Sequence, residues 1–506
     1  MEAVAPTTPA DASARPDVVA PTGRQTAFVA LGQVALMASG GLLALLIAQF
    51  FGKTTETDAF FAAYGLYTVG LVFSGTFRLT AVSRLVRAPD STIATRLIGA
   101  VALLAGLLAI PMVLFADPVG ALLVDQDPTG AAPAALRILW IAVAGQLLSA
   151  MLATILAVRG MFTAIGIVTL LSGVMSISVF LATEGRVGVD AAALGVAAGG
   201  VWLSTASLVV LWRSGWRLNL RAHGLISGVW WETRRLGYAS LTFVGMNFAY
   251  VVSVAVVTRL GEGEATLYAY AYVLAGMLVA ITANVPAMMR SPSMVASDER
   301  ASDISGAGRW SVRFTLLVGG PVLGLAALIG PPLLAFALGG GFDEADARAI
   351  VLMMACFGGW VIASAAGIFA IVELVARSEL RRLALLAIGQ ITAITAAAIA
   401  GASLAGAPGA ALALSVVALT VTVIQMRWAY GERPSTALRW MGADALRELA
   451  VVILASGPPA LLLWAIGRTL PGYVAAGLLA LVLAPLASWR AWPDDVAALV
   501  GSLRQG

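Results

Sequence analysis

Long apolar stretches, separated by short polar segments, are the feature that most restricts what this chain can fold into. Of its 506 residues, 60% are hydrophobic and 11% are charged, whereas a soluble chain carries about 25% charged residues. Too little polar surface is present to cover such a chain in water, which excludes a soluble globular fold. The apolar runs are continuous and do not alternate, which favours membrane-spanning helices over a transmembrane barrel.

Fourteen apolar stretches are long enough to cross about 30 Å of hydrocarbon. They are 28–51, 59–80, 94–116, 134–158, 161–183, 190–212, 236–258, 266–289, 311–338, 349–375, 383–404, 407–429, 449–467 and 472–489. Segment 1–27 is rich in Pro, Ala and Thr and contains no apolar run, so it is predicted to be a disordered cytoplasmic tail. The sequence therefore predicts an all-α polytopic membrane protein with about fourteen transmembrane helices.

The basic residues indicate how these helices are oriented. With the N-terminus inside, 25 of the 31 basic residues fall in cytoplasmic segments and 6 fall in outer segments. Cytoplasmic loops of membrane proteins carry an excess of Lys and Arg, so the count supports fourteen crossings with both termini cytoplasmic. The predicted location is the bacterial cytoplasmic membrane. The excess of basic over acidic residues is explained by the topology and by attraction to anionic lipid of the inner leaflet. It does not indicate nucleic-acid binding.

Two small residue counts restrict the chemistry. Cys356 is the one cysteine, which excludes an intrachain disulfide and a Cys-based metal site. His223 is the one histidine and lies in a basic loop, which argues against a His-rich metal centre and a Ser-His-Asp triad. The sequence contains no phosphate-binding loop and no soluble catalytic domain, so no ATP hydrolysis and no cofactor are expected. Coupling to membrane potential, to ions or to downstream use of the substrate stays open.

Two pairs of stretches indicate an internal repeat. AQFFGKTTETDAFFAAYGLY, from Ala48, has the same order of features as VVTRLGEGEATLYAYAYVLA, from Val256. In each, an apolar helix ends at a glycine, an acidic outer turn follows, and an aromatic-rich helix begins. FADPVGALL, with Pro118, is matched in the same way by IGPPLLAFAL, with Pro332. An even number of crossings separates the copies, so the repeat is parallel, about an axis along the membrane normal.

The repeat divides the chain into two parallel six-helix lobes. The predicted parts are an N-lobe at 28–213, a basic cytoplasmic linker at 214–235, a C-lobe at 236–429, and a C-terminal helix pair with its tail at 430–506. The linker is rich in Trp and Arg, and either holds a helix lying on the inner membrane face or serves topology alone. Two lobes facing one another across a central cavity are typical of a transporter that works by alternating access.

At these stretches the sequence resembles the MurJ/MviN family of lipid II flippases, within the superfamily of multidrug, oligosaccharidyl-lipid and polysaccharide (MOP) exporters. TETDAFFAAYGL, EGEATLYAYAYVLAGMLVAITANVPAMMRSPSMV and GPPLLAFALGGGFDEADARAI carry the resemblance. It covers most of 28–429. The resemblance implies a MATE-like fold and transport of an undecaprenyl-diphosphate-linked glycan for cell-wall synthesis. The family's cavity arginines are not matched here, since their positions fall on Leu71, Val72 and Tyr272.

Ionisable residues inside membrane spans are candidates for function, because burying a charge is costly. Arg78 and Arg290 lie near the inner ends of spans 2 and 8, at similar places in the two repeats. They would clamp a diphosphate if they face the cavity, and would otherwise extend to the lipid headgroups. Glu373 is a candidate coupling carboxylate or the partner of Arg377, four residues away. Asp58 opens span 2 and is predicted to cap that helix.

Neutral polar side chains in spans 1, 7 and 8 are candidates for lining a sugar-binding cavity, because aromatic rings stack on sugar faces and hydroxyls bond to them. These residues are Gln33, Ser39, Asn247, Tyr250, Tyr268, Tyr272 and Asn284. Packing between helices is the competing interpretation. No catalytic residue and no metal ligand is predicted.

The leading functional hypothesis is a flippase for a lipid-linked glycan, with lipid II as the favoured cargo. The partners expected are this substrate, membrane lipids and proteins of cell-wall synthesis. Four alternatives stay open: a flippase for another polysaccharide precursor, a MATE-like exporter, a membrane glycosyltransferase, and a scaffold for wall synthesis that does not transport.

Overall fold

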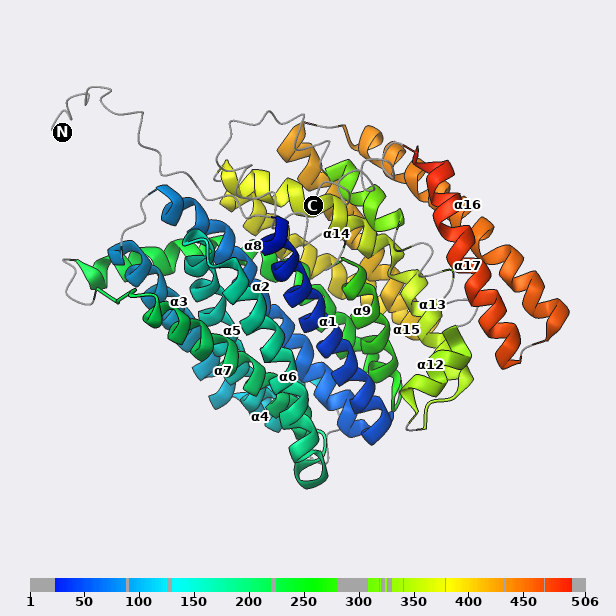
Figure 1. The fold of residues 1–506 in the computed structure, drawn as a ribbon, viewed down its shortest axis with the longest axis horizontal. Helices are drawn as coiled ribbons and strands as arrows, with labels where there is room; N and C mark the ends of the chain where they lie inside the picture. The colour runs from blue at the N-terminus through cyan, green and yellow to red at the C-terminus, as the bar shows by residue number, and fades with distance from the viewer. Residues whose placement is uncertain are drawn as a thin grey trace.

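Helices form all the regular secondary structure that the computed structural model of this chain describes, which includes no strand (Figure 1). The described residues are 23–87, 91–124, 130–219, 224–279, 282, 308–317, 319, 324, 330–339, 341–377, 379–431, 433–467 and 469–493. Of the predicted disordered tail at 1–27, residues 23–27 instead form the start of a helix, and the rest lies outside these ranges.

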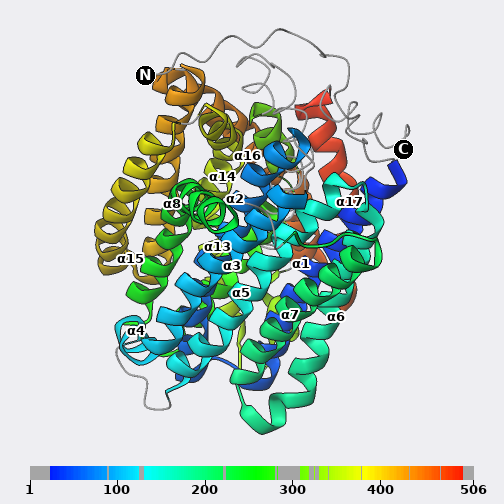
Figure 2. The ribbon, with the colours of Figure 1, turned by 90° about the vertical axis from the view of Figure 1, so that its left-hand side faces the viewer.

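The helices of the N-terminal half form one group in space, the N-terminal bundle (Figures 1 and 2). They are α1 (Gly23–Phe51), α2 (Thr55–Arg87), α3 (Ser91–Leu114), α4 (Ala116–Leu123), α5 (Ala131–Val158), α6 (Phe162–Val187) and α7 (Asp190–Arg213). Glycines let several of these helices approach closely. A Cβ atom on Gly145 would lie 3.0 Å from the carbonyl oxygen of Gly200. The backbones of α5 and α7 are therefore in close contact at this point.

The helices after residue 224 form a C-terminal bundle beside the first, followed by a pair at the edge of the molecule (Figure 1). The bundle contains α8 (Leu225–Val257), α9 (Glu264–Val279), α12 (Gly330–Leu338), α13 (Glu344–Cys356), α14 (Gly358–Ala376) and α15 (Leu380–Tyr430). The edge pair is α16 (Pro434–Ile466) and α17 (Leu470–Ala491), which pack on each other. Helix α2 packs against α8, so the two bundles meet along their central helices.

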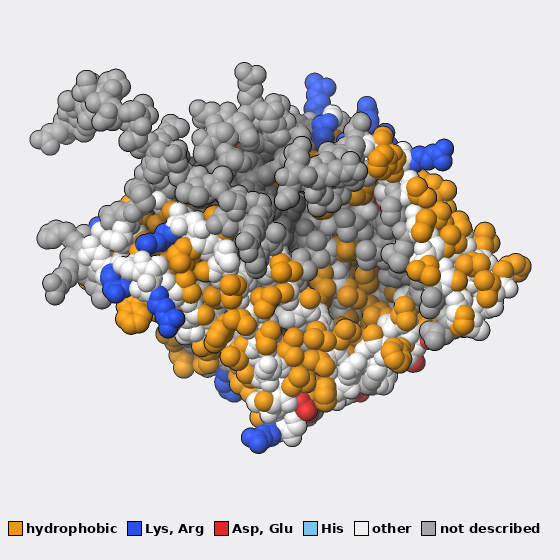
Figure 3. All heavy atoms as spheres, in the orientation of Figure 1, with side chains coloured by type: hydrophobic (Ala, Val, Ile, Leu, Met, Phe, Trp, Pro, Cys, Tyr) orange, Lys and Arg blue, Asp and Glu red, His pale blue; other side chains and the backbone are white. Residues whose placement is uncertain are grey.

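The outer surface of the helices is apolar. Within the described residues, seven helices are long and apolar enough to cross a membrane by length and composition. Large apolar side chains such as Leu122, Leu404 and Trp464 are 71%, 86% and 85% exposed, and Figure 3 shows such side chains covering much of the described surface, with charged ones near its edges. The predicted all-α polytopic membrane fold is confirmed. The count of fourteen crossings stays a prediction.

Several helices differ in detail from the predicted spans. Helix α8 begins at Leu225, so it extends into the segment predicted as a linker. The predicted spans 383–404 and 407–429 are two helical segments of the element α15, and non-helical backbone at Ala405 and Gly406 divides them as predicted. The two Pro-containing stretches of the predicted repeat both form short helices, α4 and α12.

Candidate functional site

The corner between α1 and α2 makes several polar contacts between the two bundles. Gly52 ends α1 with a φ of +66°, a value that favours glycine. Thr54 and Thr57 then cap the start of α2 reciprocally. The Thr54 N–H donates to Thr57 Oγ1 over 2.8 Å, and the Thr57 N–H donates to Thr54 Oγ1 over 3.3 Å. The N-terminus of α2 is thus capped by its own threonines, and Asp58 is available for another contact.

Asp58 caps the start of α9, which belongs to the other bundle. Its Oδ2 accepts a hydrogen bond of 2.7 Å from the Gly263 N–H, and its Oδ1 accepts one of 2.7 Å from the Thr266 N–H. The Thr266 hydroxyl also donates to Oδ1. These backbone groups belong to the N-terminal turn of a helix, where N–H groups otherwise lack partners. The sequence predicted a capping role for Asp58 correctly but assigned it to the wrong helix.

Burial sets the electrostatics of this contact. Asp58 is 4% exposed, and desolvation raises the pKa of its carboxyl above the ordinary value. The hydrogen bonds from Thr266 and Gly263 oppose this shift, and the nearby Glu262 adds to it. Separating the bundles would hydrate Asp58 and remove the cost of its burial. That cost offsets part of the stabilisation that the hydrogen bonds to Asp58 provide.

An ion pair lies beside this cap. Lys53 Nζ contacts both carboxylate oxygens of Asp346, at 2.8 and 2.6 Å. Asp346 is held in place by a capping box at the start of α13: its N–H donates to Asp343 Oδ1 and its Oδ2 accepts from the Asp343 N–H. The same backbone bond, from Asp346, lowers the pKa of the Asp343 carboxyl. Lys53 therefore meets a pre-oriented carboxylate.

Glycine is required at the point of closest approach. Gly263 has a φ of +82°, and a Cβ atom there would lie 3.1 Å from Lys53 Cβ. We call Lys53, Asp58, Gly263, Thr266 and Asp346 the interbundle junction. Other hydrogen bonds join the same ends of the bundles: Thr57 to Thr266, Thr55 to Glu262, Tyr270 to the Ala44 carbonyl, Gln49 to the Ala337 carbonyl, and Thr258 to the Leu123 carbonyl. All of these contacts lie at the end of the helices predicted to face outside.

An aromatic cluster continues from the junction along α8 and α9. The rings of Tyr250 and Tyr272 stack with centroids 3.8 Å apart, and Tyr272 lies 4.7 Å from Trp360 of α14. Tyr250 and Tyr268 are 1% and 0% exposed. The Tyr250 hydroxyl has no hydrogen-bond partner among the described residues. The three tyrosines predicted as candidates thus lie together, and two of them are fully buried in this state.

The remaining predicted candidates are spread through the chain. Ser39 donates to the Leu36 carbonyl of its own helix and packs against Gly173 of α6. Asn247 is half-buried in α8. Glu373 of α14 forms an ion pair with Arg377, which directly follows the end of that helix, and this is the plainer of its two predicted roles. Arg290, Asn284 and the side chains of Arg78 and Gln33 lie outside the described residues.

Sequence reasoning missed the partners of Asp58 and the pairing of Lys53. One signal was present: Lys53 is the single lysine of the chain and lies in a turn expected to be acidic. No group of three His, Cys, Asp or Glu side chains that could hold a metal occurs within the described ranges. The contacts of the interbundle junction are hydrogen bonds and one ion pair.

Comparisons with known proteins place this arrangement in one family. The sequence model described as Lipid II flippase MurJ matches residues 47–483. A search of curated proteins finds no match. Among solved structures, "Lipid II flippase MurJ, inward closed conformation" is 15% identical, with a TM-score of 0.67 over 92% of this chain and 99% of that one.

Two further solved structures are similar in fold. A MOP superfamily transporter from Pyrococcus furiosus is 14% identical, with a TM-score of 0.58 over 82% of this chain and 96% of its own. A multidrug resistance MATE family transporter in an outward-facing conformation is 14% identical, with a TM-score of 0.56 and the same coverage. At these identities the structural matches establish the fold alone.

Proposed function

Because this chain belongs to the lipid II flippase MurJ family, we propose that it moves an undecaprenyl-diphosphate-linked glycan across the bacterial cytoplasmic membrane, with lipid II as the favoured cargo. The family match over 47–483 is the observation that carries this proposal. The expected role is to supply the outer face of the membrane with precursor for peptidoglycan. The expected mechanism is alternating access, in which two lobes rock about a central cavity.

The N-terminal and C-terminal bundles are the proposed moving lobes, at 28–213 and 236–429. The interbundle junction holds them together at the end predicted to face outside, so the described state is closed on that side. A sugar-diphosphate head would enter between the lobes from the cytoplasmic side, while the prenyl tail stays in lipid. Opening of the junction would then release the head outside.

The strength of the junction suits a gate that opens in every cycle. The Asp58 cap is worth about 1 kcal/mol by comparison with other helix caps. Lys53 is 37% exposed, so its ion pair with Asp346 is screened by solvent and worth about 1 kcal/mol or less. A conformational gap of a few kcal/mol leaves both states accessible to a transporter. The interbundle junction is therefore weak enough for cargo binding to open it.

Recognition of the cargo is assigned to two groups of residues. Arg78 and Arg290 are the proposed contacts for the diphosphate, because the planar guanidinium group matches paired phosphate oxygens. The tyrosines of the aromatic cluster are the proposed contacts for sugar rings, which stack on aromatic faces. Tyr272 is half-buried while Tyr250 and Tyr268 are enclosed, so Tyr272 is the first of the three that a sugar would reach.

Depletion in cells tests the proposal. The gene for the full chain is placed under a repressible promoter, and lipid II is measured separately in each leaflet as the protein is depleted. The proposal predicts that lipid II accumulates in the inner leaflet and falls in the outer one. A parallel measurement of other prenyl-linked glycans identifies the cargo if it is not lipid II. Unchanged leaflet distributions of all these lipids would overturn the proposal.

A multidrug exporter is the second candidate, favoured by the structural similarity to a MATE family transporter. It predicts that depletion sensitises cells to amphipathic cations while lipid II keeps its distribution. The same depletion strain therefore separates the two functions.

A further inference from the structure

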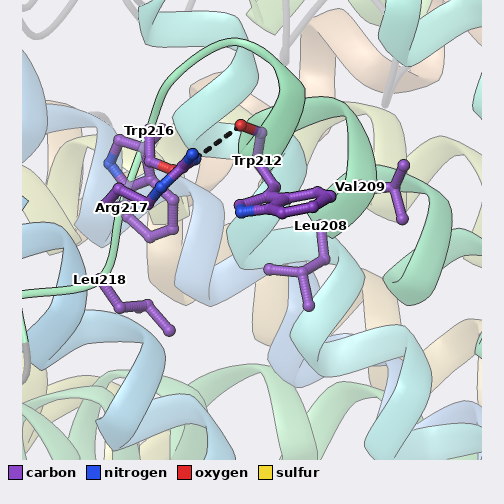
Figure 4. Close-up of a pocket in the computed structure, with 6 residues that line it drawn as sticks. All are labelled: Leu208, Val209, Trp212, Trp216, Arg217 and Leu218. Carbon is purple, nitrogen blue, oxygen red and sulfur yellow. Dashed lines mark hydrogen bonds between the residues drawn. The ribbon is translucent and has the colours of Figure 1, made fainter.

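A groove on the surface of the N-terminal bundle lies far from the interbundle junction. It is formed by the last two turns of α7 and the segment that follows, and it encloses about 330 Å³, close to the lower end of the range for ligand sites, about 300–1,000 Å³. Figure 4 shows the residues around it: Leu208, Val209, Trp212, Trp216, Arg217 and Leu218. Five of the six are apolar.

The apolar walls of this groove are open to the surroundings. Leu208, Val209 and Trp212 are 44%, 45% and 60% exposed. Helix α7 is among the helices apolar enough to span a membrane, and these residues lie at its C-terminal end, which is predicted to be cytoplasmic. Tryptophan at such an end is typical of the membrane interface. The walls therefore face the level where the lipid headgroups of the inner leaflet meet the acyl chains.

A cation is fixed at the rim of the groove. Arg217 Nη1 donates to the carbonyl oxygens of Trp212 and Trp216, over 2.8 and 3.1 Å. The guanidinium carbon lies 5.5 Å from the centre of the Trp212 ring, a cation–π distance. Both hydrogen bonds use the Nη1 nitrogen, and the other two guanidinium nitrogens of Arg217 have no partner within the described part of the chain. The guanidinium group is therefore pre-positioned with donors to spare.

The surroundings of Arg217 favour an anion. Arg213, the last residue of α7, is exposed, and Arg159 at the end of α5 donates to the Ser214 carbonyl across 3.4 Å. No acidic residue occurs in the sequence between Asp190 and Glu232. An apolar groove at headgroup depth, with a fixed guanidinium at its rim and no competing carboxylate in that stretch, is complementary to a lipid with a negative headgroup.

We propose that this groove binds one anionic phospholipid of the inner leaflet, with an acyl chain against Leu208, Val209 and Trp212 and the phosphate on Arg217. The occupant is a membrane phospholipid, distinct from the transported cargo, whose head passes between the bundles. Binding would tie the end of α7 and the start of the linker to the membrane surface. The N-terminal bundle would thereby gain a fixed point against which the other bundle moves.

Native mass spectrometry on the purified full chain tests this site, with phosphatidylglycerol and phosphatidylcholine as the two probes. Arg217→Gln removes the charge at the rim, and Val209→Trp fills the groove. Arg186→Gln is the matched control for charge, since Arg186 is also exposed but lies at the other end of the α6–α7 hairpin. Val201→Trp is the control for bulk, because Val201 is 46% exposed on α7 outside the groove.

Wild-type protein is expected to retain phosphatidylglycerol in preference to phosphatidylcholine. Arg217→Gln should lower the affinity for phosphatidylglycerol about fivefold, as expected for one basic residue near a lipid surface, and leave phosphatidylcholine unchanged. Val209→Trp should weaken both lipids, and neither control should change them. Equal retention of the two lipids by the wild type, or an Arg217→Gln variant that behaves as Arg186→Gln does, would overturn the proposal.

Discussion

At the scale of single residues, Asp58 shows how one side chain joins two distant parts of the chain. It lies in the first turn of α2, yet it accepts hydrogen bonds from the backbone N–H groups of Gly263 and Thr266 at the start of α9. The sequence indicates that a carboxylate at this position caps a helix. It does not indicate which helix, because Thr54 and Thr57 already cap α2 and because the partner lies 205 to 208 residues away.

Removing the Asp58 carboxyl should expose the start of α9. In Asp58→Ala two buried N–H groups lose their acceptor, and Asp58→Asn keeps one carbonyl oxygen and should lose less. We expect backbone hydrogen exchange in 261–267 to rise about fivefold in the alanine variant, as a cap worth about 1 kcal/mol implies. Glu56→Gln, an exposed acidic residue of the same turn, is the control. Unchanged exchange in Asp58→Ala would contradict the assigned cap.

The Lys53–Asp346 ion pair should give a small, salt-sensitive coupling energy. Lys53→Gln and Asp346→Asn are made singly and together, and thermal unfolding gives the coupling from the double-mutant cycle. We expect about 1 kcal/mol or less, decreasing with added salt, because Lys53 is 37% exposed. The Glu344–Arg348 pair of α13, whose side chains are 47% and 59% exposed, is the comparison and should show less coupling. A larger coupling for the comparison pair would refute this ranking.

The glycine at the point of closest approach should not tolerate a side chain. Gly263→Ala places a methyl group 3.1 Å from Lys53 Cβ on a backbone with a φ of +82°, so we expect loss of thermal stability of about 1 kcal/mol or more. Gly261→Ala is the control, since its nearest contact would be an ordinary 3.7 Å. Equal stability of the two variants would show that the junction is looser than described.

At the scale of helices, the contact between Thr57 and Thr266 relates the two halves of the chain. When the helix-ending glycines of the predicted repeat, Gly52 and Gly261, are aligned, these threonines correspond, and their Oγ1 atoms lie 3.2 Å apart. Equivalent residues meet only near the axis that relates two copies, so this contact supports the parallel repeat read from the sequence. Helices α4 and α12 occupy corresponding places in the chain and support it further. The interbundle junction thus lies near the proposed axis, where the two bundles contact each other as they rock.

The interruption of α15 is a second feature of helices that the sequence predicts in part. A short turn between spans 383–404 and 407–429 is apparent from Pro408 and its glycines. The backbone packing of Gly401 on Gly409 is not, because a glycine that allows close approach looks like any other glycine in an apolar run. Two helical segments in contact immediately after a non-helical pair indicate that the chain folds back on itself.

A methyl group at Gly409 should disrupt this fold-back. The Cβ atom of Gly409→Ala would lie far inside van der Waals contact with the Gly401 carbonyl, so the two segments must separate. We expect the melting temperature to fall by several degrees, since overpacking costs about 1–3 kcal/mol. Gly389→Ala has open space around it on the same helix and should be neutral or slightly stabilising. A neutral Gly409→Ala would contradict the fold-back.

At the scale of the whole molecule, the scarcity of charged residues determines which features of the fold can be predicted from the sequence. Apolar length and the distribution of Arg predict helices, a membrane fold and an orientation, because lipid leaves the backbone few alternatives. They do not predict contacts between helices, since nearly every position is apolar and period-based patterns are weak. The three tyrosines of the aromatic cluster were predicted as candidate residues, whereas their stacking on one another and on Trp360 was not.

A reversible lock of the junction tests the central claim, that transport requires the two bundles to separate there. Thr57→Cys and Thr266→Cys place two thiols where the hydroxyl oxygens are 3.2 Å apart, in a chain whose single cysteine is replaced by Cys356→Ala. Movement of lipid II to the outer leaflet is measured in cells depleted of wild-type protein. We predict that oxidation of the double variant stops this movement, that reductant restores it, and that each single variant transports throughout. Continued transport by the fully oxidised protein would contradict the account.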